Sequence, residues 1–204
     1  MKIAVTVVFL AAIAAFFLRT RSRGQASTDG KTEPAKTQSD PREVYIGLRN
    51  SMLRGSRSKF SLTAASSPTE PWGVAMDWGV EKGTVTVVAL SDGSASVYFS
   101  TGGGLIGGGG QEPIRKAAKK AVEVARAVQV STRAATAFPL PQRGGVTFYL
   151  LTDNDAFTAN TTEAELSAGS HPFRELGDAM QGVITQYRLW DEQQGRSQNN
   201  SRMP

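Results

Sequence analysis

The apolar run over residues 3–18 constrains this chain most, because Thr6 is its only polar side chain. At 1.5 Å per residue, a helix of this length is slightly short for a hydrocarbon core of about 30 Å. Snorkelling by Lys2 and Arg19 supplies the missing length. The sequence therefore predicts a transmembrane helix with its basic flank over residues 1–23, which ties the chain to a membrane.

A cleaved signal peptide is the alternative interpretation of this segment. Residues 24–26 (Gly-Gln-Ala) suit a cleavage site, but Arg19, Arg21 and Arg23 lie between the apolar run and that site. Signal peptides carry positive charge before the apolar region, so the arginines favour an uncleaved signal-anchor. The same arginines favour a cytoplasmic domain, with an external domain as the other orientation. The predicted location is a bacterial inner membrane, crossed once.

Composition divides the rest of the chain into three parts. Residues 24–40 are polar and can bury little apolar area, which predicts a disordered linker. Residues 192–204 have the same character and are predicted to be a disordered tail. The segment 41–191 between them is long enough for one globular domain with a hydrophobic core.

Basic charge is concentrated outside this domain. Residues 1–40 hold six of the 23 lysines and arginines with three acids, and the remainder carries 17 basic and 15 acidic residues. A nucleic-acid-binding domain usually concentrates its excess positive charge on the folded part, so we expect no nucleic-acid partner. The chain has no cysteine, which excludes disulfides, thiolate catalysis and cysteine-based zinc sites.

Hydrophobic periodicity predicts an α+β domain. Helices are expected over about 41–54, 113–129 and 172–190, and a short one after the capping box at 162–165. Alternating or β-branched runs predict about five strands, at 60–64, 72–78, 84–90, 95–99 and 146–151. Strands in a run, followed by helices, predict an antiparallel meander flanked by helices.

Three motifs in these strands carry a family resemblance. They are WGV at 72–74, DGS at 92–94 and VYFSTGGG at 97–104. Together they look like the signature of an uncharacterised bacterial domain family. The resemblance would cover most of 42–190 and implies a fold unit with no catalytic residues to transfer. The helix-flanked sheet is also similar to profilin-like and roadblock domains, a likeness of fold that implies no function.

A glycine-rich loop before the second long helix is the first candidate ligand site. Gly102, Gly104 and Gly107 match the glycines of G-x-G-x-x-G, and Gly103 lies between the first two. Backbone N–H groups in such a loop can bind a phosphate at a helix start. However, the preceding strand belongs to a hairpin rather than a βαβ unit. The alternative is a connector whose Leu105 and Ile106 fill the core or contact a protein partner.

Asp153 and Asp155 follow the strand at 146–151 and form the second candidate. Two carboxylates at this spacing could hold Mg²⁺. Asp and Asn also favour turns after strands, and the sequence favours this reading. His171, the only histidine, precedes a helix and is expected to cap it rather than to act as a general base. We predict no metal site and no cofactor.

The helix over 113–129 carries a basic face opposite its alanines, and the basic residues are Arg115, Lys116, Lys119, Lys120 and Arg126. A cytoplasmic domain on a short linker would hold this face near anionic lipid, where each basic residue contributes about 1 kcal/mol. The alternative is an ordinary solvated helix face.

These features favour a membrane-tethered, non-enzymatic interaction module with an unidentified protein partner. The alternative is a small anchored enzyme, or a phosphate- or nucleotide-binding domain, that combines the glycine loop with Asp153 and Asp155. The two readings predict different surfaces. A ligand site needs a pocket where the loop meets the two aspartates. An interaction module needs an exposed apolar patch or sheet edge.

Overall fold

The computed structural model describes residues 40–63 and 67–200, with side chains described up to 194. The predicted anchor and nearly all of the predicted linker lie outside the described residues. Within the described ranges, no helix combines the length and apolar character that crossing a membrane requires.

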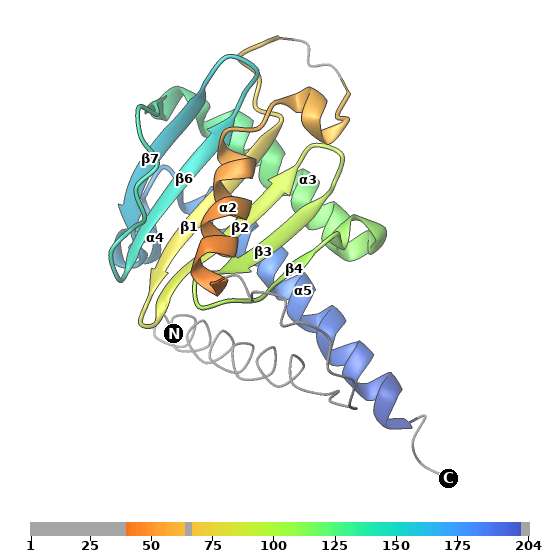
Figure 1. Ribbon diagram of the computed structural model, residues 1–204. Helices are drawn as coiled ribbons and strands as arrows, with labels where there is room; N and C mark the ends of the chain where they lie inside the picture. Colours follow the sequence, from red (N-terminus) through yellow and green to blue (C-terminus); the bar gives the residue numbers. More distant parts are fainter. Residues whose placement is uncertain (1–39, 64–66, 201–204) are drawn as a thin grey trace.

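The described residues form an α+β fold, as predicted, with one antiparallel sheet and four α-helices (Figure 1). The helices are α2 (Pro41–Leu53), α3 (Glu112–Val128), α4 (Glu163–Ser167) and α5 (Arg174–Asn200). The strands are β1 (Gly73–Val80), β2 (Gly83–Leu90), β3 (Ala95–Phe99), β4 (Gly104–Ile106), β5 (Arg133–Ala134), β6 (Gly145–Leu151) and β7 (Ala156–Thr162). Their order across the sheet is β4-β3-β2-β1-β6-β7-β5.

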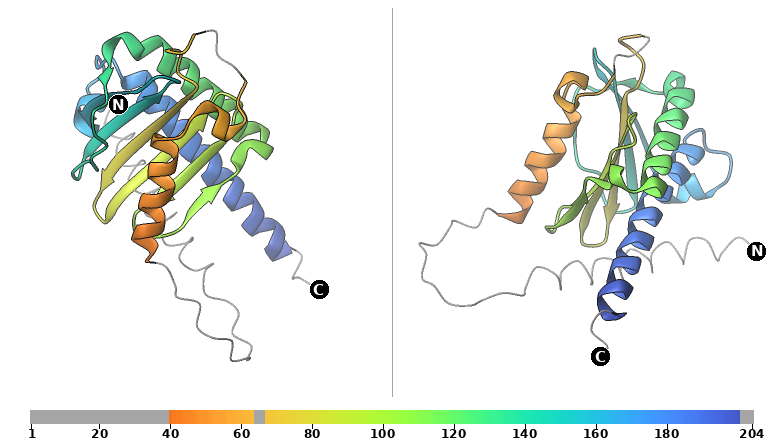
Figure 2. Two further views of the ribbon diagram at one scale, coloured as in Figure 1. Left: turned by 45° about the horizontal axis from the view of Figure 1, so that its top comes forward. Right: turned by 90° about the vertical axis from the view of Figure 1, so that its right-hand side faces the viewer.

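The elements pack in three layers. Helix α2 covers one face of the sheet, and α3 and α5 cover the other (Figure 2). Alternate residues along the strands therefore enter different cores. Val74 and Met76 of β1 lie in the core under α3 and α5, whereas Ala75 lies in the core under α2.

Helix α2 begins as its sequence predicts. Asp40 accepts a hydrogen bond from the Arg42 N–H at 2.9 Å, and Pro41 occupies the first turn. Helix α5 ends later than predicted, because it continues to Asn200 rather than stopping near residue 190. The part of the predicted polar tail up to Asn200 is therefore helical.

The sheet differs from the prediction of about five strands. The expected strand at 60–64 is wrong over its described residues, since Arg57–Phe60 form a 3-10 helix and Ser61 takes a left-handed φ of 54°. Strands β4, β5 and β7 were not predicted. The first two are only three and two residues long, and β7 is mostly threonine and alanine, so none shows a clear hydrophobic period.

The meander prediction is confirmed for β1, β2 and β3, which pair in chain order, and the unpredicted β4 extends the meander by one strand. The chain then crosses the sheet through α3, and β6 pairs with the free side of β1. This crossover leaves β4 as an edge strand. It also separates β6, and the turn that follows β6, from β4 by the three strands β3, β2 and β1.

Candidate interaction surface

The glycine loop and the two aspartates do not meet. Gly104 lies in β4, at one edge of the sheet, whereas Asp153 and Asp155 lie in the β6–β7 turn. Three strands separate β4 from β6, which corresponds to roughly 19 Å at the usual strand spacing. The structure therefore does not assemble the combined ligand site that the sequence suggested.

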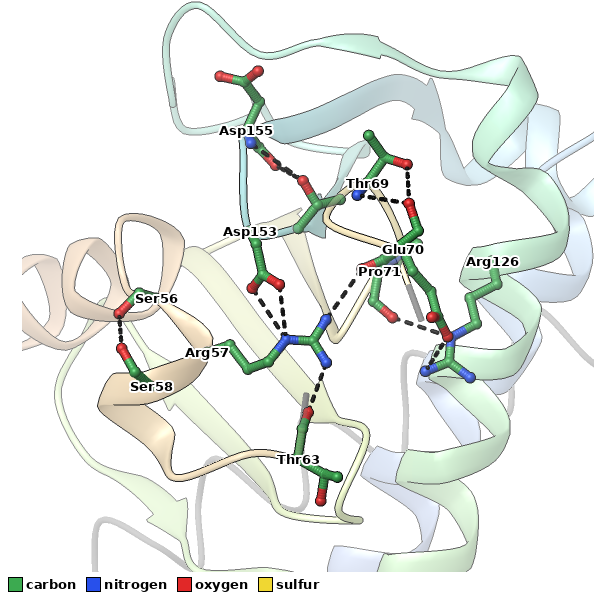
Figure 3. Close-up of polar contacts among 12 residues, drawn as sticks. Ser56, Arg57, Ser58, Thr63, Thr69, Glu70, Pro71, Arg126, Asp153 and Asp155 are labelled. Carbon is green, nitrogen blue, oxygen red and sulfur yellow. Dashed lines mark hydrogen bonds and ion pairs between the residues drawn. The ribbon is translucent and has the colours of Figure 1, made fainter. Parts of the chain in front are cut away.

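Asp153 is engaged in an ion pair (Figure 3). The Nε of Arg57 donates to both carboxylate oxygens, at 3.0 and 3.1 Å. The same guanidinium donates to the carbonyl oxygens of Thr63 and Glu70, at 2.8 and 3.5 Å. Arg57 is buried, so this set of acceptors holds a charge that would otherwise be desolvated without a partner. The ion pair with Asp153 thus links the 3-10 helix that begins at Arg57, before β1, to the β6–β7 turn.

Asp155 plays a different part in the same turn. Its backbone N–H donates to the Thr152 hydroxyl at 3.2 Å, and its carbonyl oxygen accepts from that hydroxyl at 2.6 Å. The backbone of Asp155 therefore forms a hydrogen-bonded turn with Thr152, as the turn interpretation expects. Its side chain is exposed.

The two aspartates are expected to differ in their effect on stability. Asp153→Ala should lower the free energy of unfolding by about 1–2 kcal/mol, because the buried Arg57 loses its carboxylate. Asp155→Ala should change it by less than about 0.5 kcal/mol. Urea denaturation of both variants checks this. Equal effects would show that the Arg57 ion pair contributes no net stability.

The basic face of α3 is partly neutralised. Glu112 pairs with Arg115 and lies 3.5 Å from the Nζ of Lys116, and Arg126 pairs with Glu70 at 3.0 Å. Arg126 also donates to the Pro71 carbonyl oxygen. These contacts support the reading of a solvated or structural face for three of the five basic residues. The exposed side chains that remain for lipid contact are Lys119 and Lys120, and membrane contact by this face stays a prediction.

The glycine loop serves two structural roles, of which the first is the β3–β4 turn. Gly102 and Gly103 have φ values of 101° and 84°, in the left-handed region that favours glycine. A Cβ at Gly102 would also lie 2.9 Å from the Cβ of Pro41. The turn therefore brings β4 beside the first residues of α2.

The second role is close packing at the start of α3. The Tyr187 hydroxyl on α5 accepts a hydrogen bond from the Gly108 N–H at 3.0 Å and donates to the Ala95 carbonyl oxygen at 2.6 Å. A Cβ at Gly108 would lie 2.6 Å from the Cζ of Tyr187 and 2.7 Å from Ile114. One glycine N–H that could have faced a phosphate is thus bonded within the protein.

Gly108→Ala is expected to destabilise the domain by about 1–3 kcal/mol, because an added methyl group overpacks the contact with Tyr187. Gly110→Ala is the matched control, since a Cβ there meets nothing within 4 Å. Thermal melting of the two variants measures the difference. A phosphate-binding role would instead predict that both variants keep their stability without ligand.

Leu105 and Ile106 separate into the two roles that the sequence left open. Leu105 pairs with Val97 and packs, partly buried, against the core under α3 and α5. Ile106 pairs with Ser96 on the opposite face of the sheet and is 67 % exposed. Leu105 therefore fills the core, and Ile106 is available to a partner.

The stretch of chain that contains Ile106 is uncharged. Residues 94–111 contain no Asp, Glu, Lys or Arg. Ile106 lies on the face of the sheet that α2 covers, because it pairs with Ser96, which shares its face of β3 with Tyr98 in the core under α2. Val44 of α2 is 47 % exposed. Val44 follows Pro41 by one helical turn, so it lies on the side of α2 that approaches the β3–β4 turn. We call β4 with Val44 the β4 edge.

A buried polar network holds α2 to the sheet. The Arg49 guanidinium binds the Asp77 carboxylate through Nε at 2.8 Å and Nη2 at 2.5 Å. The Thr86 hydroxyl donates to Asp77 at 2.6 Å, and so the Tyr45 hydroxyl, 2.8 Å away, donates to Thr86. Arg49 and Asp77 are 2 % and 0 % exposed. The network connects α2, β1 and β2.

Sequence analysis assigned no role to this network, although two signals were present. Asp77 lies two residues after Ala75 and therefore on the same face of its strand. Arg49 lies one turn after Tyr45 on the apolar stripe of α2. Burial raises the pKa of Asp77, and its contacts with Arg49 and Thr86 oppose that rise. A charged pair in this place is stable only because each member satisfies the other.

His171 lies in the turn that precedes α5. Its Nδ1 accepts from the Phe173 N–H at 3.3 Å, and its Nε2 lies 3.3 Å from the Thr161 hydroxyl. Among residues 40–63 and 67–200, no group of three or more His, Asp or Glu residues could hold a metal ion. The histidine therefore bonds within the turn before α5, and its capping of the helix stays a prediction.

Comparison of the chain with protein-family models, curated proteins and solved structures gave no match. The resemblance of the motifs at 72–74, 92–94 and 97–104 to a bacterial domain family therefore stays a prediction. So does the likeness to profilin-like and roadblock domains.

Proposed function

We propose that this chain is a membrane-tethered, non-enzymatic interaction module that binds a protein partner through the β4 edge. The single observation that carries the proposal is the 67 % exposure of Ile106 on an edge strand within an uncharged stretch of 18 residues, 94–111. Natural edge strands are usually protected by charges, prolines or covering elements. An open apolar edge of this kind is typical of strands that pair with another chain.

The polar groups that suggested an enzyme or ligand site make contacts within the fold instead. Asp153 is paired with Arg57, Gly108 is bonded to Tyr187, and His171 is bonded to the backbone of the turn before α5. A site that joined the glycine loop to the aspartates would have to span three strands. The anchored-enzyme alternative therefore lacks an assembled site in the described residues.

The position of the β4 edge also suits a tethered module. The proposed linker ends at Asp40, and the next residue, Pro41, lies beside Gly102 at the β3–β4 turn. The contact surface therefore lies next to the point where the chain enters the domain. A tether that ends here would hold the β4 edge close to partners in or on the same membrane.

Site-specific photo-crosslinking tests the proposal. A photoreactive phenylalanine derivative is placed at position 106 of the full chain in cells, and adducts are isolated by mass. We expect one dominant protein adduct. The control places the same residue at Val130, which is 94 % exposed at the opposite end of α3 from the glycine loop. Equal and heterogeneous adducts at the two positions, or none at 106, would contradict the proposal.

A further inference from the structure

We infer that the partner at the β4 edge is a second copy of this chain, which pairs its β4 antiparallel to the first around a two-fold axis at Leu105. This inference rests on the proposed function and names the partner of the same surface. It follows from the backbone register of β4, from the side chains on its two faces and from the charge of the edge.

The register of β4 determines which backbone groups are open. The Phe99 N–H donates to the Gly103 carbonyl oxygen at 3.2 Å, and the Gly102 N–H donates to the Phe99 carbonyl oxygen at 2.9 Å. Hydrogen-bonded pairs alternate along an antiparallel ladder, so Leu105 is the next residue bonded to β3. The N–H and C=O groups of Gly104 and Ile106 therefore point away from the sheet.

These open groups are self-complementary. When two β4 strands run antiparallel with Leu105 opposite Leu105, each Gly104 lies opposite an Ile106 of the other copy. Both such pairs are of the hydrogen-bonded type, which is the arrangement that exchanges two backbone bonds. A two-fold axis through the Leu105 pair relates the copies, as a closed dimer requires.

The side chains fit the same arrangement. Ile106 faces Gly104 of the second copy, which has no side chain to exclude it. Its two diagonal neighbours are Gly102 and Ile106 of the second copy, and Pro41 lies against Gly102 within each copy. Ile106 of each copy would therefore cover Pro41 and Val44 of the other. Exposed apolar groups of both copies are buried at once.

The absence of charge at the edge and the direction of the two tethers favour a second copy over an unrelated chain. An identical copy meets no like charge along residues 94–111, since the stretch has none. A two-fold axis perpendicular to the sheet keeps both α2 helices on the same face. Their first residues then lie near the axis, so two tethers would leave the dimer on one side and reach one membrane.

A single-cysteine experiment in the full chain tests the register. The chain has no cysteine, so L105C and I106C each introduce one thiol. At the axis, the two Leu105 Cα atoms would lie about 4.5 Å apart, within disulfide range. The two Ile106 Cα atoms would lie roughly 8 Å apart, beyond that range. Mild oxidation in the cell fraction that holds the chain should give disulfide dimers for L105C and at least tenfold fewer for I106C.

The contrast is informative because random collision predicts the reverse. Ile106 is the more exposed side chain, so non-specific oxidation would favour I106C. More dimer from I106C than from L105C would overturn the inference. If L105C forms no dimer while position 106 photo-crosslinks a different protein, the proposed function stands and the second copy is excluded.

A second variant tests the dimer without relying on the correct folding of L105C. Ile106→Lys adds a charge at an exposed position and should reduce the mass of the full chain from two copies to one in light scattering. Val130→Lys, at a more exposed position, should leave the dimer unchanged. A wild-type chain of one copy at the highest concentration reached, or an unchanged dimer in Ile106→Lys, would overturn the inference.

Discussion

Arg49→Met is expected to lower the free energy of unfolding by about 3–5 kcal/mol, because it leaves the Asp77 carboxylate buried without its cation. Asp77 is 0 % exposed, and among the described residues it keeps the hydrogen bond from Thr86. The methionine fills most of the volume of the arginine stem, so the loss reports the polar contacts of Arg49 rather than a cavity. Besides the ion pair, these are its hydrogen bonds to the carbonyl oxygens of Phe138 and Pro139. Urea denaturation followed by tryptophan fluorescence measures it.

Two further variants separate the ion pair from general damage to α2. Arg42→Met makes the same substitution on the same helix at an exposed position and should change stability by less than about 0.5 kcal/mol. Adding Asp77→Leu to Arg49→Met removes both charges and should recover part of the loss. If the double variant is no more stable than Arg49→Met, the unpaired carboxylate is not the cause.

Raising the pH from 10 to 12 is expected to unfold the domain cooperatively. Burial raises the pKa of Tyr45, Tyr149 and Tyr187 from 10.0 to about 12. Each hydroxyl donates a hydrogen bond, to Thr86, Pro139 and Ala95 respectively. Since the folded pKa lies above the unfolded pKa, this stability is fully present below pH 10 and is lost as the pH rises towards 12. By linkage, each tyrosine costs about 1.4 kcal/mol at pH 11, or about 4 kcal/mol for the three.

Denaturation curves at pH 8 and pH 11 measure this loss, and tyrosinate absorbance follows the titration itself. In Tyr187→Phe, the drop in stability between the two pH values should be smaller than in the wild type by about 1.4 kcal/mol. A drop of equal size in both proteins would show that Tyr187 titrates normally in the folded state. A gradual absorbance change near pH 10, without unfolding, would contradict the account for all three tyrosines.

The fold could be predicted where local signals were strong. The cap at Asp40 marks the start of α2, and the capping box of Thr162 and Glu165 marks α4. The β-branched run at 84–90 is a central strand, buried at all positions after Gly83. These elements have patterns set by their own residues, so an alternation or a cap identifies them without knowledge of the rest of the chain.

The remaining elements depend on contacts distant in sequence. Strand β4 has three residues, and its pairing to β3 depends on the positive φ values of Gly102 and Gly103. Pattern analysis read this stretch as a loop because glycine carries no hydrophobic period. The pairing of Asp153 with Arg57 joins residues 96 positions apart, and no spacing rule along the chain indicates such a contact.

The candidate surface was predicted in part. Sequence analysis named Leu105 and Ile106 as residues that either fill the core or contact a partner, and the fold gives one role to each. Which residue took which role follows from the sheet face, which the register with Val97 and Ser96 determines. A shift of one residue in that register would have exchanged the two.

Amide hydrogen exchange at β4 tests the central claim most directly, that the β4 edge pairs with a partner strand. Exchange is measured in the full chain at high concentration in its own fraction and after dilution until a single copy remains. The account predicts that the outward N–H groups of Gly104 and Ile106 are protected only in the concentrated state, while Leu105, bonded to β3, is protected in both. Rapid exchange at Gly104 and Ile106 in both states would contradict it.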